Sequence, residues 1–415
     1  MSKYIIMPCG SLNGEVEISG SKNALLPILA ASIMGEGESV IKNAPMLVDS
    51  HNMCSMLTHL GAKLQISEDT ICIKPHNLSG DLENFAPVEL LRASFLISGP
   101  LLAKIGKVNI SMPGGCQIGV RPIDLHLKGL CALGADIEQQ HGYIKLSCRK
   151  LKGNKIYLDF PSVGATENIM MAASMADGET IIENAATEPE ISDLALYINN
   201  MGGKVTGAGT DTIKIMGVKK LKGCTHFVIP DRIEAGTFMI GAAATKGNIL
   251  IKNVIPQHLK PVTSKLREIG INVDEGDTFI KICGESPINA TDIKTLPYPG
   301  FPTDMQAQFS TLLSISNGTS VVTETIFENR FMHLTELKRM GANIKIDGRT
   351  SVIQGIDHLT GASVRATDLR AGAALVIAGL VADGQTEIDN IGYLDRGYYK
   401  FEEKMNKLGA NITRI

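Results

Sequence analysis

The 415-residue chain has no tryptophan, and aromatic residues of all kinds make up only 5% of it. It also lacks an excess of charge, because 40 Lys and Arg face 43 Asp and Glu and leave a net charge of −3. General nucleic-acid binders carry a basic excess, so we expect no nucleic-acid partner. The longest apolar runs, at residues 24–34 and 371–382, are shorter than the ~20 residues that cross a bilayer, so we expect no membrane partner.

Motifs for metal, nucleotide and hydrolase chemistry are also missing. The eight cysteines, at positions 9, 54, 72, 116, 131, 148, 224 and 283, include no Cys-x-x-Cys pair and no metal-like spacing. No P-loop, G-x-G-x-x-G, H-E-x-x-H or G-x-S-x-G motif occurs, so Walker-type nucleotide hydrolysis, dinucleotide redox chemistry and zinc hydrolysis lack support. Scattered thiols and an N-terminus without a long apolar stretch predict a reduced, cytoplasmic protein without a signal peptide.

Glycine, in contrast, is abundant, and two sets of glycines mark an internal repeat. The first set follows a hydrophobic residue at the end of a helix-like segment, at Gly61, Gly134, Gly202, Gly270, Gly341 and Gly409. The second set precedes a short strand-like segment, at Gly37, Gly106, Gly178, Gly247, Gly318 and Gly384. Both sets recur about every 70 residues, which predicts six copies of one folding unit. Glycine after a helix adopts a positive φ without a Cβ clash.

Each copy reads as strand, helix, strand, helix, strand, strand, which predicts an α/β fold. The first helix is apolar on all sides, so we expect it to be buried, whereas the second alternates charged and apolar residues and should face solvent. The sixth copy ends before its last strand, and we infer that the N-terminal strands, at residues 4–7 and 15–19, complete it. Three copies then form a continuous domain, residues 22–229, and three form a discontinuous domain, residues 1–21 and 230–415.

Polar residues precede the first helix of each copy. A helix N-terminus presents free N–H groups and a partial positive charge, so it is a ready anion site. Helix capping explains Ser162 and Thr303 equally well. Lysine and arginine oppose the helix dipole, so Lys22, Arg92 and Arg370 indicate a bound anion, with structural ion pairs as the alternative.

Three arginines, Arg121, Arg330 and Arg396, occupy an equivalent position before the second helix of their copies. Arginine suits bidentate binding of carboxylate or phosphate, and three equivalent arginines are able to converge on one cleft. The alternative is a surface salt bridge, which is common and contributes little to stability.

A glycine-rich loop, Met-Pro-Gly-Gly-Cys-Gln-Ile-Gly at residues 112–119, carries Cys116 five residues before Arg121. Cysteine is usually a small buried hydrophobe, as we expect for Cys72 and Cys131, but such a loop offers little core. Nearby cations favour the thiolate, so Cys116 is predicted to be a nucleophile or a proton donor.

The strings GSKNALLP, MPGGCQIGVRPIDLHL, GFPTDMQAQF, ENRF, ATDLRA and LDRGY resemble the UDP-N-acetylglucosamine 1-carboxyvinyltransferase family along the whole chain. The resemblance implies an inside-out α/β barrel of two domains with three βαβαββ units each, and an active site in the cleft between them. It implies transfer of the enolpyruvyl group of phosphoenolpyruvate to the 3′-hydroxyl of UDP-N-acetylglucosamine, with release of phosphate, in peptidoglycan synthesis. The implied partners are these two small molecules, with no metal, cofactor or obligate protein partner.

The resemblance also implies roles for individual residues. Phosphoenolpyruvate is a small anion, and its implied contacts are Lys22, Asn23, Arg121, Arg330, Arg370 and Arg396. Cys116 would protonate the methylene carbon and is the site at which fosfomycin alkylates the family, and Asp304 would accept the proton of the sugar hydroxyl. Lys22, Asn23 and Arg396 complete the implied catalytic set. The implied contacts of the sugar nucleotide are Arg92, Arg121, Pro122, Ile123, Asp124, Leu125, Ser162, Val163, Gly164, Asp304 and Ile326.

One position departs from the family, because some members carry lysine where Phe160 stands. Three rival functions stay open at this stage. The sister reaction transfers the same group to shikimate 3-phosphate on the same fold, although we expect no comparable cysteine loop there. A catalytically silent nucleotide-sugar sensor would be favoured by loss of Cys116, Lys22 or Asp304, all of which are present. A cysteine hydrolase would need a histidine in a matching motif, and His126 is more consistent with a structural or substrate-binding role.

Overall fold

The computed structural model describes residues 2–83, 85, 88, 92–112, 123–140, 142–285 and 287–415, apart from the side chains of Arg92 and Gln140. Within these ranges the chain divides into two compact units. We call the described residues between 20 and 229 the continuous unit, and residues 2–19 with 230–415 the discontinuous unit. No helix in the described ranges is long and apolar enough to cross a bilayer.

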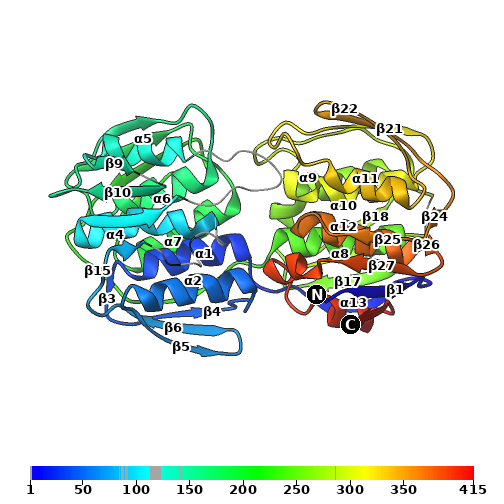
Figure 1. Cartoon of the computed structure of the whole chain (residues 1–415), viewed down its shortest axis with the longest axis horizontal. Helices are drawn as coiled ribbons and strands as arrows, with labels where there is room; N and C mark the ends of the chain where they lie inside the picture. The colour runs from blue at the N-terminus through cyan, green and yellow to red at the C-terminus, as the bar shows by residue number, and fades with distance from the viewer. Residues whose placement is uncertain are drawn as a thin grey trace. The chain divides into compact units, whose positions relative to one another are not determined.

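Three four-stranded sheets form the continuous unit, as far as its residues are described (Figure 1). In each sheet the first strand is parallel to the second, and the other two are antiparallel to their neighbours. In sheet order the strands are β16 (Thr225–Phe227), β4 (Ser39–Lys42), β6 (Thr70–Lys74) and β5 (Lys63–Ser67); β7 (Asp81–Leu82), β8 (Lys107–Ser111), β10 (Tyr143–Ser147) and β9 (Asp136–Gln140); and β11 (Lys155–Tyr157), β12 (Glu179–Glu183), β14 (Thr212–Met216) and β13 (Val205–Thr206). The short strands β3 (Gly35–Glu36) and β15 (Leu221–Lys222) form a parallel pair.

The discontinuous unit repeats the same topology in three sheets of its described residues. In sheet order the strands are β2 (Asn13–Glu17), β17 (Asn248–Lys252), β19 (Phe279–Cys283) and β18 (Asn272–Glu275); β20 (Ile293–Lys294), β21 (Thr319–Thr323), β23 (Thr350–Gln354) and β22 (Asn343–Asp347); and β25 (Ser363–Arg365), β27 (Thr386–Asp389), β1 (Tyr4–Met7) and β28 (Asn411–Arg414). The short strands β24 (Leu359–Thr360) and β26 (Ala382–Asp383) are paired. The six similar sheets, three in each unit, correspond to the six copies seen in the sequence. They confirm the predicted α/β fold class.

The two N-terminal strands belong to different copies. β1 pairs with β27 and β28 and supplies the missing last strand of the sixth copy, as predicted. β2 instead pairs in parallel with β17 and completes the fourth copy, so the prediction that it joins the sixth copy is wrong. In exchange, β16 pairs with β4 and completes the first copy. A repeat read from sequence shows that each sheet needs a parallel first strand, but not which part of the chain supplies it.

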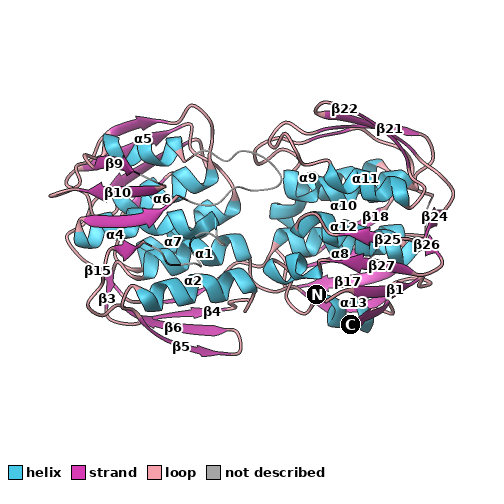
Figure 2. Cartoon of the chain, in the orientation of Figure 1, coloured by secondary structure: helices cyan, strands magenta, loops and turns pink. Residues whose placement is uncertain are grey.

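The first helix of each copy is buried on nearly every side, as predicted. These helices are α1 (Lys22–Ser32), α4 (Ser98–Ile105) after η1 (Arg92–Ile97), α6 (Val163–Ala173), α8 (Arg232–Ala244), α10 (Gln306–Ser314) after η3 (Thr303–Met305), and α12 (Leu369–Val381). In α12, every residue from 370 to 380 is buried. Figure 2 shows helices inside each unit and strands at its margins. Small residues allow this arrangement, because they let neighbouring elements approach the helices closely.

The second helices are half buried rather than fully facing solvent. They are α2 (Val48–His59), α5 (Asp124–Ala132), α7 (Pro189–Asn200), α9 (Lys260–Glu268) after η2 (Pro256–Leu259), α11 (Met332–Arg339), and α13 (Phe401–Lys407) after η4 (Ile391–Arg396). On α5 the prediction that Cys131 is buried is wrong, because Cys131 lies on the solvent side of the helix. Cys72 is half buried, and Cys54 on α2 is buried.

The marker glycines have a positive φ with one exception. At Gly247 the preceding Lys246 adopts the positive φ, of 52°. A Cβ on Gly247 would lie 2.0 Å from the carbonyl oxygen of Leu12. Glycine is therefore required there by close approach of the N-terminal segment, and not by a left-handed backbone.

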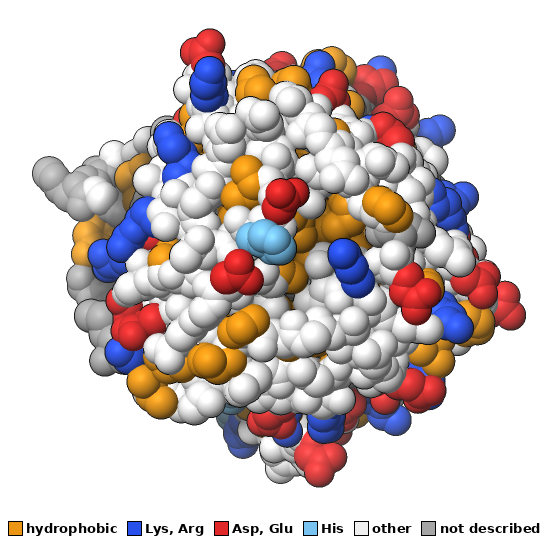
Figure 3. Space-filling model, turned by 90° about the vertical axis from the view of Figure 1, so that its right-hand side faces the viewer, with side chains coloured by type: hydrophobic (Ala, Val, Ile, Leu, Met, Phe, Trp, Pro, Cys, Tyr) orange, Lys and Arg blue, Asp and Glu red, His pale blue; other side chains and the backbone are white. Residues whose placement is uncertain are grey.

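Acidic and basic side chains are interspersed over the face of the discontinuous unit in Figure 3. This mixture agrees with the near balance of charges in the sequence.

One buried carboxylate makes a prediction about stability. Glu167 on α6 is 3% exposed, and burial, with repulsion from Glu190 and Glu188, raises its pKa well above the ordinary value. The folded chain therefore holds this proton at a pH where the unfolded chain has lost it, so stability falls as pH rises above the unfolded pKa. Glu167→Gln has no ionisable group at this position and removes this loss of stability at high pH. We therefore expect the variant to melt at a higher temperature than the wild type, and the difference to be a few degrees larger at pH 8 than at pH 5.

The measurement is thermal unfolding followed by circular dichroism at both pH values. Glu179→Gln is the matched control, because Glu179 is an exposed carboxylate on the neighbouring strand β12. An equal difference between the Glu167 variant and the wild type at pH 5 and pH 8 would contradict the argument.

Candidate active site

The N-terminus of α1 carries Lys22 and Asn23, and Ser21 caps it by accepting a hydrogen bond from the Ala24 N–H at 3.3 Å. Nζ of Lys22 lies 3.4 Å from Oδ2 of Asp49 on α2, whose side chain is 3% exposed. This ion pair holds the ammonium of Lys22 in place. The structure thus shows the ion pair that was the alternative for Lys22. The Lys22 side chain is 13% exposed.

The N-termini of α5 and α6 lie together in the continuous unit. A Cβ on Gly164 would lie 3.1 Å from the ring of His126. That ring lies with Nδ1 3.0 Å from Nδ2 of Asn168 and packs edge-on against Phe95, with centroids 5.3 Å apart. His126 therefore makes structural contacts, and it holds two predicted segments against each other. These segments contain Ile123, Asp124 and Leu125, and Ser162, Val163 and Gly164.

Helix capping accounts for some of the polar residues before the first helices. Ser162 accepts a hydrogen bond from the Ala165 N–H at 3.4 Å, so capping, one of the two explanations for this residue, is present. Asp368 caps α12 by accepting from Arg370 and Ala371 N–H groups. Thr303 does not cap a helix with its side chain, because its hydroxyl is hydrogen-bonded to Glu324 and Arg330.

In the discontinuous unit, Asp304 lies between two arginines. Its Oδ1 accepts a hydrogen bond from Nη2 of Arg330 at 2.7 Å, and its Oδ2 accepts one from Nη2 of Arg370 at 3.0 Å. The arginine side chains are each 3% exposed, whereas that of Asp304 is 26% exposed. Three predicted site residues from separate segments of the chain thus converge, and the carboxylate is the member that reaches solvent.

The two guanidinium groups are held by aromatic rings as well as by Asp304. Arg330 lies 5.3 Å from the ring centroid of Phe327, and Arg370 lies 5.4 Å from that of Tyr398. Burial alone lowers the pKa of Arg370, but the Asp304 carboxylate and Tyr398 raise it above its ordinary value overall. Arg370 therefore stays charged although it is buried.

Both arginines keep hydrogen-bonding capacity. Nε of Arg330 and Nε of Arg370 are buried and have no hydrogen-bond partner among the described residues. Burial lowers the pKa of nearby His333 to about 4, so this histidine is neutral at neutral pH. The cluster is thus two fixed cations that share one carboxylate, an arrangement able to accept an additional anion.

Arg396 ends η4 and is half buried. The residue before it, Asp395, is bound by both Nη atoms of Arg414 on β28, at 2.7 and 3.1 Å. Two residues after Arg396, the hydroxyl of Tyr398 lies 2.9 Å from that of Thr237. The side chains of Asp395 and Tyr398, on either side of Arg396, are therefore held by hydrogen bonds.

Four predicted residues are not placed by the structure. Cys116, Arg121 and Pro122 lie outside the described residues, and so does the side chain of Arg92, which begins η1. Their roles stay predictions.

Sequence reasoning missed two buried carboxylates that support the site, Asp49 and Glu324. Asp49 is 2% exposed and Glu324 is 1% exposed. Glu324 directly follows the predicted strand that became β21, and an acidic residue at the end of a buried strand was a usable signal. Asp49 offered no such signal, because its partner Lys22 lies on another helix.

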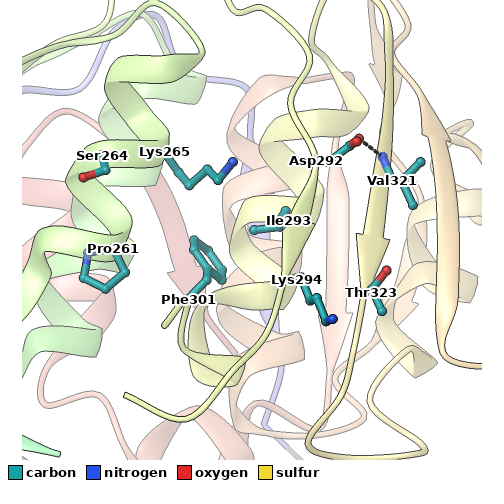
Figure 4. Close-up of a pocket in the computed structure, with 9 residues that line it drawn as sticks. All are labelled: Pro261, Ser264, Lys265, Asp292, Ile293, Lys294, Phe301, Val321 and Thr323. Carbon is teal, nitrogen blue, oxygen red and sulfur yellow. Dashed lines mark hydrogen bonds between the residues drawn. The ribbon is translucent and has the colours of Figure 1, made fainter. Parts of the chain in front are cut away.

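A cavity of about 470 Å³ lies elsewhere in the discontinuous unit. Figure 4 shows that it is lined by α9, β20, β21 and the ring of Phe301, with Oδ1 of Asp292 accepting a hydrogen bond from the Val321 N–H at 2.7 Å. None of the predicted site residues lines it. Cavity volume therefore does not locate the predicted site, which is defined by its charged side chains.

The chain is similar to known proteins along almost its whole length. Residues 6–405 match the family model described as EPSP synthase (3-phosphoshikimate 1-carboxyvinyltransferase). A protein of Caldanaerobacter subterraneus, named UDP-N-acetylglucosamine 1-carboxyvinyltransferase 1, is 58% identical over all of this chain and 99% of its own length. A protein of Carboxydothermus hydrogenoformans, named UDP-N-acetylglucosamine 1-carboxyvinyltransferase 2, is 57% identical over the full length of both chains.

Solved structures with lower sequence identity share the fold. The enolpyruvyl transferase NikO of Streptomyces tendae superposes with a TM-score of 0.91 at 22% identity, over all of this chain and 98% of its own. An EPSP synthase of Acinetobacter baumannii superposes with a TM-score of 0.79 at 19% identity, over the whole of both chains. At these identities the likeness establishes the architecture and leaves the substrate to be argued from the site.

Proposed function

This chain belongs to the EPSP synthase (3-phosphoshikimate 1-carboxyvinyltransferase) family, among relatives named UDP-N-acetylglucosamine 1-carboxyvinyltransferase, and from this we propose its reaction. It transfers the enolpyruvyl group of phosphoenolpyruvate to the 3′-hydroxyl of UDP-N-acetylglucosamine and releases phosphate, a step of peptidoglycan synthesis. The relatives indicate the sugar nucleotide as acceptor. The observation that carries the chemistry is the carboxylate of Asp304 shared by two buried arginines.

The reaction proceeds by addition and then elimination. In the addition, the hydroxyl oxygen of the sugar bonds to C2 of phosphoenolpyruvate, the hydroxyl loses its proton, and C3 gains a proton. In the elimination, C3 loses a proton, the double bond re-forms, and the bond from C2 to the phosphate oxygen breaks. No atom changes its overall oxidation state, so the reaction needs no redox cofactor, and we assign charge neutralisation to lysine and arginine side chains.

Asp304 is the proposed general base for the sugar hydroxyl. In the structure each of its two oxygens accepts one hydrogen bond, one from Arg330 and one from Arg370. Each carboxylate oxygen has a second lone pair that is able to accept the proton of the hydroxyl, and the carboxylate becomes a better base when its contacts with the arginines weaken. An anionic substrate that binds the arginines competes for them, so binding of phosphoenolpyruvate and freeing of the base become one event.

The phosphate and carboxylate of phosphoenolpyruvate are assigned to Arg330, Arg370 and Arg396, together with Lys22 and Arg121. Asn23, beside Lys22 at the N-terminus of α1, is assigned to the tetrahedral intermediate. Hydrogen bonds from charged donors stabilise an anion most where its charge is concentrated, so these residues favour the transition state and the tetrahedral intermediate. Lys22 lies in the continuous unit and Arg330 in the discontinuous unit.

Cys116 is the proposed donor of the proton to C3, on the strength of family membership and its glycine-rich sequence. The sugar nucleotide is assigned to the adjacent N-termini of α5 and α6, to Ile326 and to Asp304, and also to Arg92, Arg121 and Pro122. Contact between the ring of His126 and Gly164 supports a single binding surface at the two helix N-termini.

We further propose that the chain works in the cytoplasm with small molecules as its partners. The described cysteines are free thiols, which is typical of a reducing compartment.

The test is release of inorganic phosphate from phosphoenolpyruvate with either acceptor. We expect release with UDP-N-acetylglucosamine and none above background with shikimate 3-phosphate. Release only with shikimate 3-phosphate would assign the sister reaction. No release with either acceptor, combined with binding of UDP-N-acetylglucosamine in calorimetry, would replace the enzyme with a nucleotide-sugar sensor.

A further inference from the structure

Glu324 is a buried carboxylate that directly follows β21 and is 1% exposed. Its Oε1 accepts hydrogen bonds from the Thr295 hydroxyl at 2.8 Å and from the Ile326 N–H at 2.8 Å. The Phe327 N–H also donates to Oε1, at 3.1 Å. Its Oε2 accepts a hydrogen bond from the Thr303 hydroxyl at 2.8 Å. A buried charge is tolerated when hydrogen bonds replace its hydration, and both oxygens meet this condition.

One side of this carboxylate fixes the backbone that carries Ile326. Two consecutive N–H groups, those of Ile326 and Phe327, point at the same oxygen and set the direction of the chain after β21. The ring of Phe327 in turn lies 5.3 Å from the guanidinium carbon of Arg330. The carboxylate therefore determines where Ile326 is presented.

The other side of the carboxylate leads to the proposed base. The Thr303 hydroxyl has one proton, which it donates to Glu324, so its lone pairs are left for an incoming donor. Nη1 of Arg330 donates to that oxygen at 3.0 Å, while Nη2 of Arg330 donates to Asp304 at 2.7 Å. One chain of hydrogen bonds thus connects Glu324 to Asp304 through Thr303 and Arg330. At Thr303 the hydroxyl donates to Glu324 and accepts from Arg330.

We propose that Glu324 is a positioning residue for the reaction, acting on Asp304 through Thr303 and Arg330 and on the sugar nucleotide through the backbone of Ile326. The inference rests on the proposed function, because it assigns its effects to the proposed base and the proposed acceptor. We expect the path through Thr303 and Arg330 to affect turnover. We expect the path through the backbone of Ile326 to affect the affinity for UDP-N-acetylglucosamine. A charged hydrogen bond that fixes an arginine also limits its motion when the substrate anion binds.

The first experiment compares two substitutions of Thr303 in the full chain. Thr303→Val keeps the shape and removes the hydroxyl, so Arg330 loses one acceptor and Glu324 loses one donor. We expect kcat to fall about 10- to 100-fold, with the KM for UDP-N-acetylglucosamine changed far less. Thr303→Ser restores the hydroxyl and is expected to recover kcat to within about threefold of the wild type.

The second experiment replaces Glu324 by glutamine, which preserves size and removes the charge. We expect Glu324→Gln to lower kcat and also to raise the KM for UDP-N-acetylglucosamine about tenfold, because the backbone at Ile326 is affected too. Asp347→Asn is the matched control, since Asp347 is an exposed carboxylate on β22 of the same sheet. In the double variant Glu324→Gln with Thr303→Val, the kcat losses are expected to be less than multiplicative, since both act through one path.

The outcomes separate the inference from the function on which it rests. A wild-type chain inactive with both acceptors refutes the proposed function. An active wild type with a folded Thr303→Val variant of unchanged kcat overturns the inference alone, and so does a Thr303→Ser variant as impaired as Thr303→Val. Should Glu324→Gln fail to fold, the comparison of valine with serine at Thr303 still decides between these results.

Discussion

Asp304→Asn is expected to lower kcat by about 10²- to 10⁴-fold, the contribution that a positioned general base makes to proton transfer. Asparagine keeps the size of the side chain and has no basic oxygen. Its amide N–H₂ would also face one of the two guanidinium groups, which are themselves donors, so one arginine contact is lost. The measurement is steady-state phosphate release with both substrates varied.

The same variant has a second expected signature, which a general loss of structure would not produce. Removal of the shared carboxylate leaves Arg330 and Arg370, each 3% exposed, without their counter-ion. We expect stability to fall by about 1–3 kcal/mol, because a buried charge loses a partner but keeps one hydrogen bond. Inorganic phosphate is then expected to raise the melting temperature of the variant more than that of the wild type, since it replaces the missing anion.

Asp357→Asn serves as the control, because Asp357 is an exposed carboxylate of the same unit. Wild-type turnover in Asp304→Asn would exclude Asp304 as the base. An equal effect of phosphate on variant and wild type would show that the arginines are not the anion site.

The sheet architecture was predictable from sequence because it depends on local and periodic signals. Glycines ending helices and all-apolar helices recur in every copy, and each has a physical cause that acts within a few residues. The exchange of β2 and β16 between copies was not predictable, because it depends on pairing between segments more than 180 residues apart. The repeat in the sequence shows that each sheet needs a first strand. It does not show which segment of the chain supplies that strand.

Members of the candidate site were recognisable in sequence to the extent that charged side chains stand where propensity disfavours them. Lys22 and Arg370 at helix N-termini are such residues, and both prove to be ion-paired with carboxylates. Sequence reasoning did not identify those carboxylates as partners. Asp49 is an ordinary polar residue in sequence, and its importance appears only when its burial and its ion pair with Lys22 are known. Glu324 stands at the end of a predicted strand, but only its burial and hydrogen bonds show what it supports. Supporting residues of this kind are therefore systematically harder to predict than the charges they hold.

Cys116→Ala is the remaining variant for which we expect a very large effect. If this thiol donates the proton to C3, alanine removes the acid and should lower turnover by about 10²- to 10⁴-fold. Cys116→Asp should recover part of the activity, because a carboxyl group is able to donate the same proton. The measurement is phosphate release together with thermal unfolding, and we expect little change in melting temperature, since the surrounding sequence is glycine-rich and is predicted to offer little core.

Alkylation separates the role of this thiol from that of the others. Fosfomycin is expected to inactivate the wild type with addition of one molecule, seen by mass spectrometry, and to leave the activity of Cys116→Asp unchanged. Cys131→Ala is the matched control, because Cys131 is an exposed thiol on α5 and should be inactivated like the wild type. Full activity in Cys116→Ala would remove the thiol from the mechanism. The proton for C3 would then have to come from another acid, and Asp304, after it has accepted the proton of the sugar hydroxyl, would be the first to test.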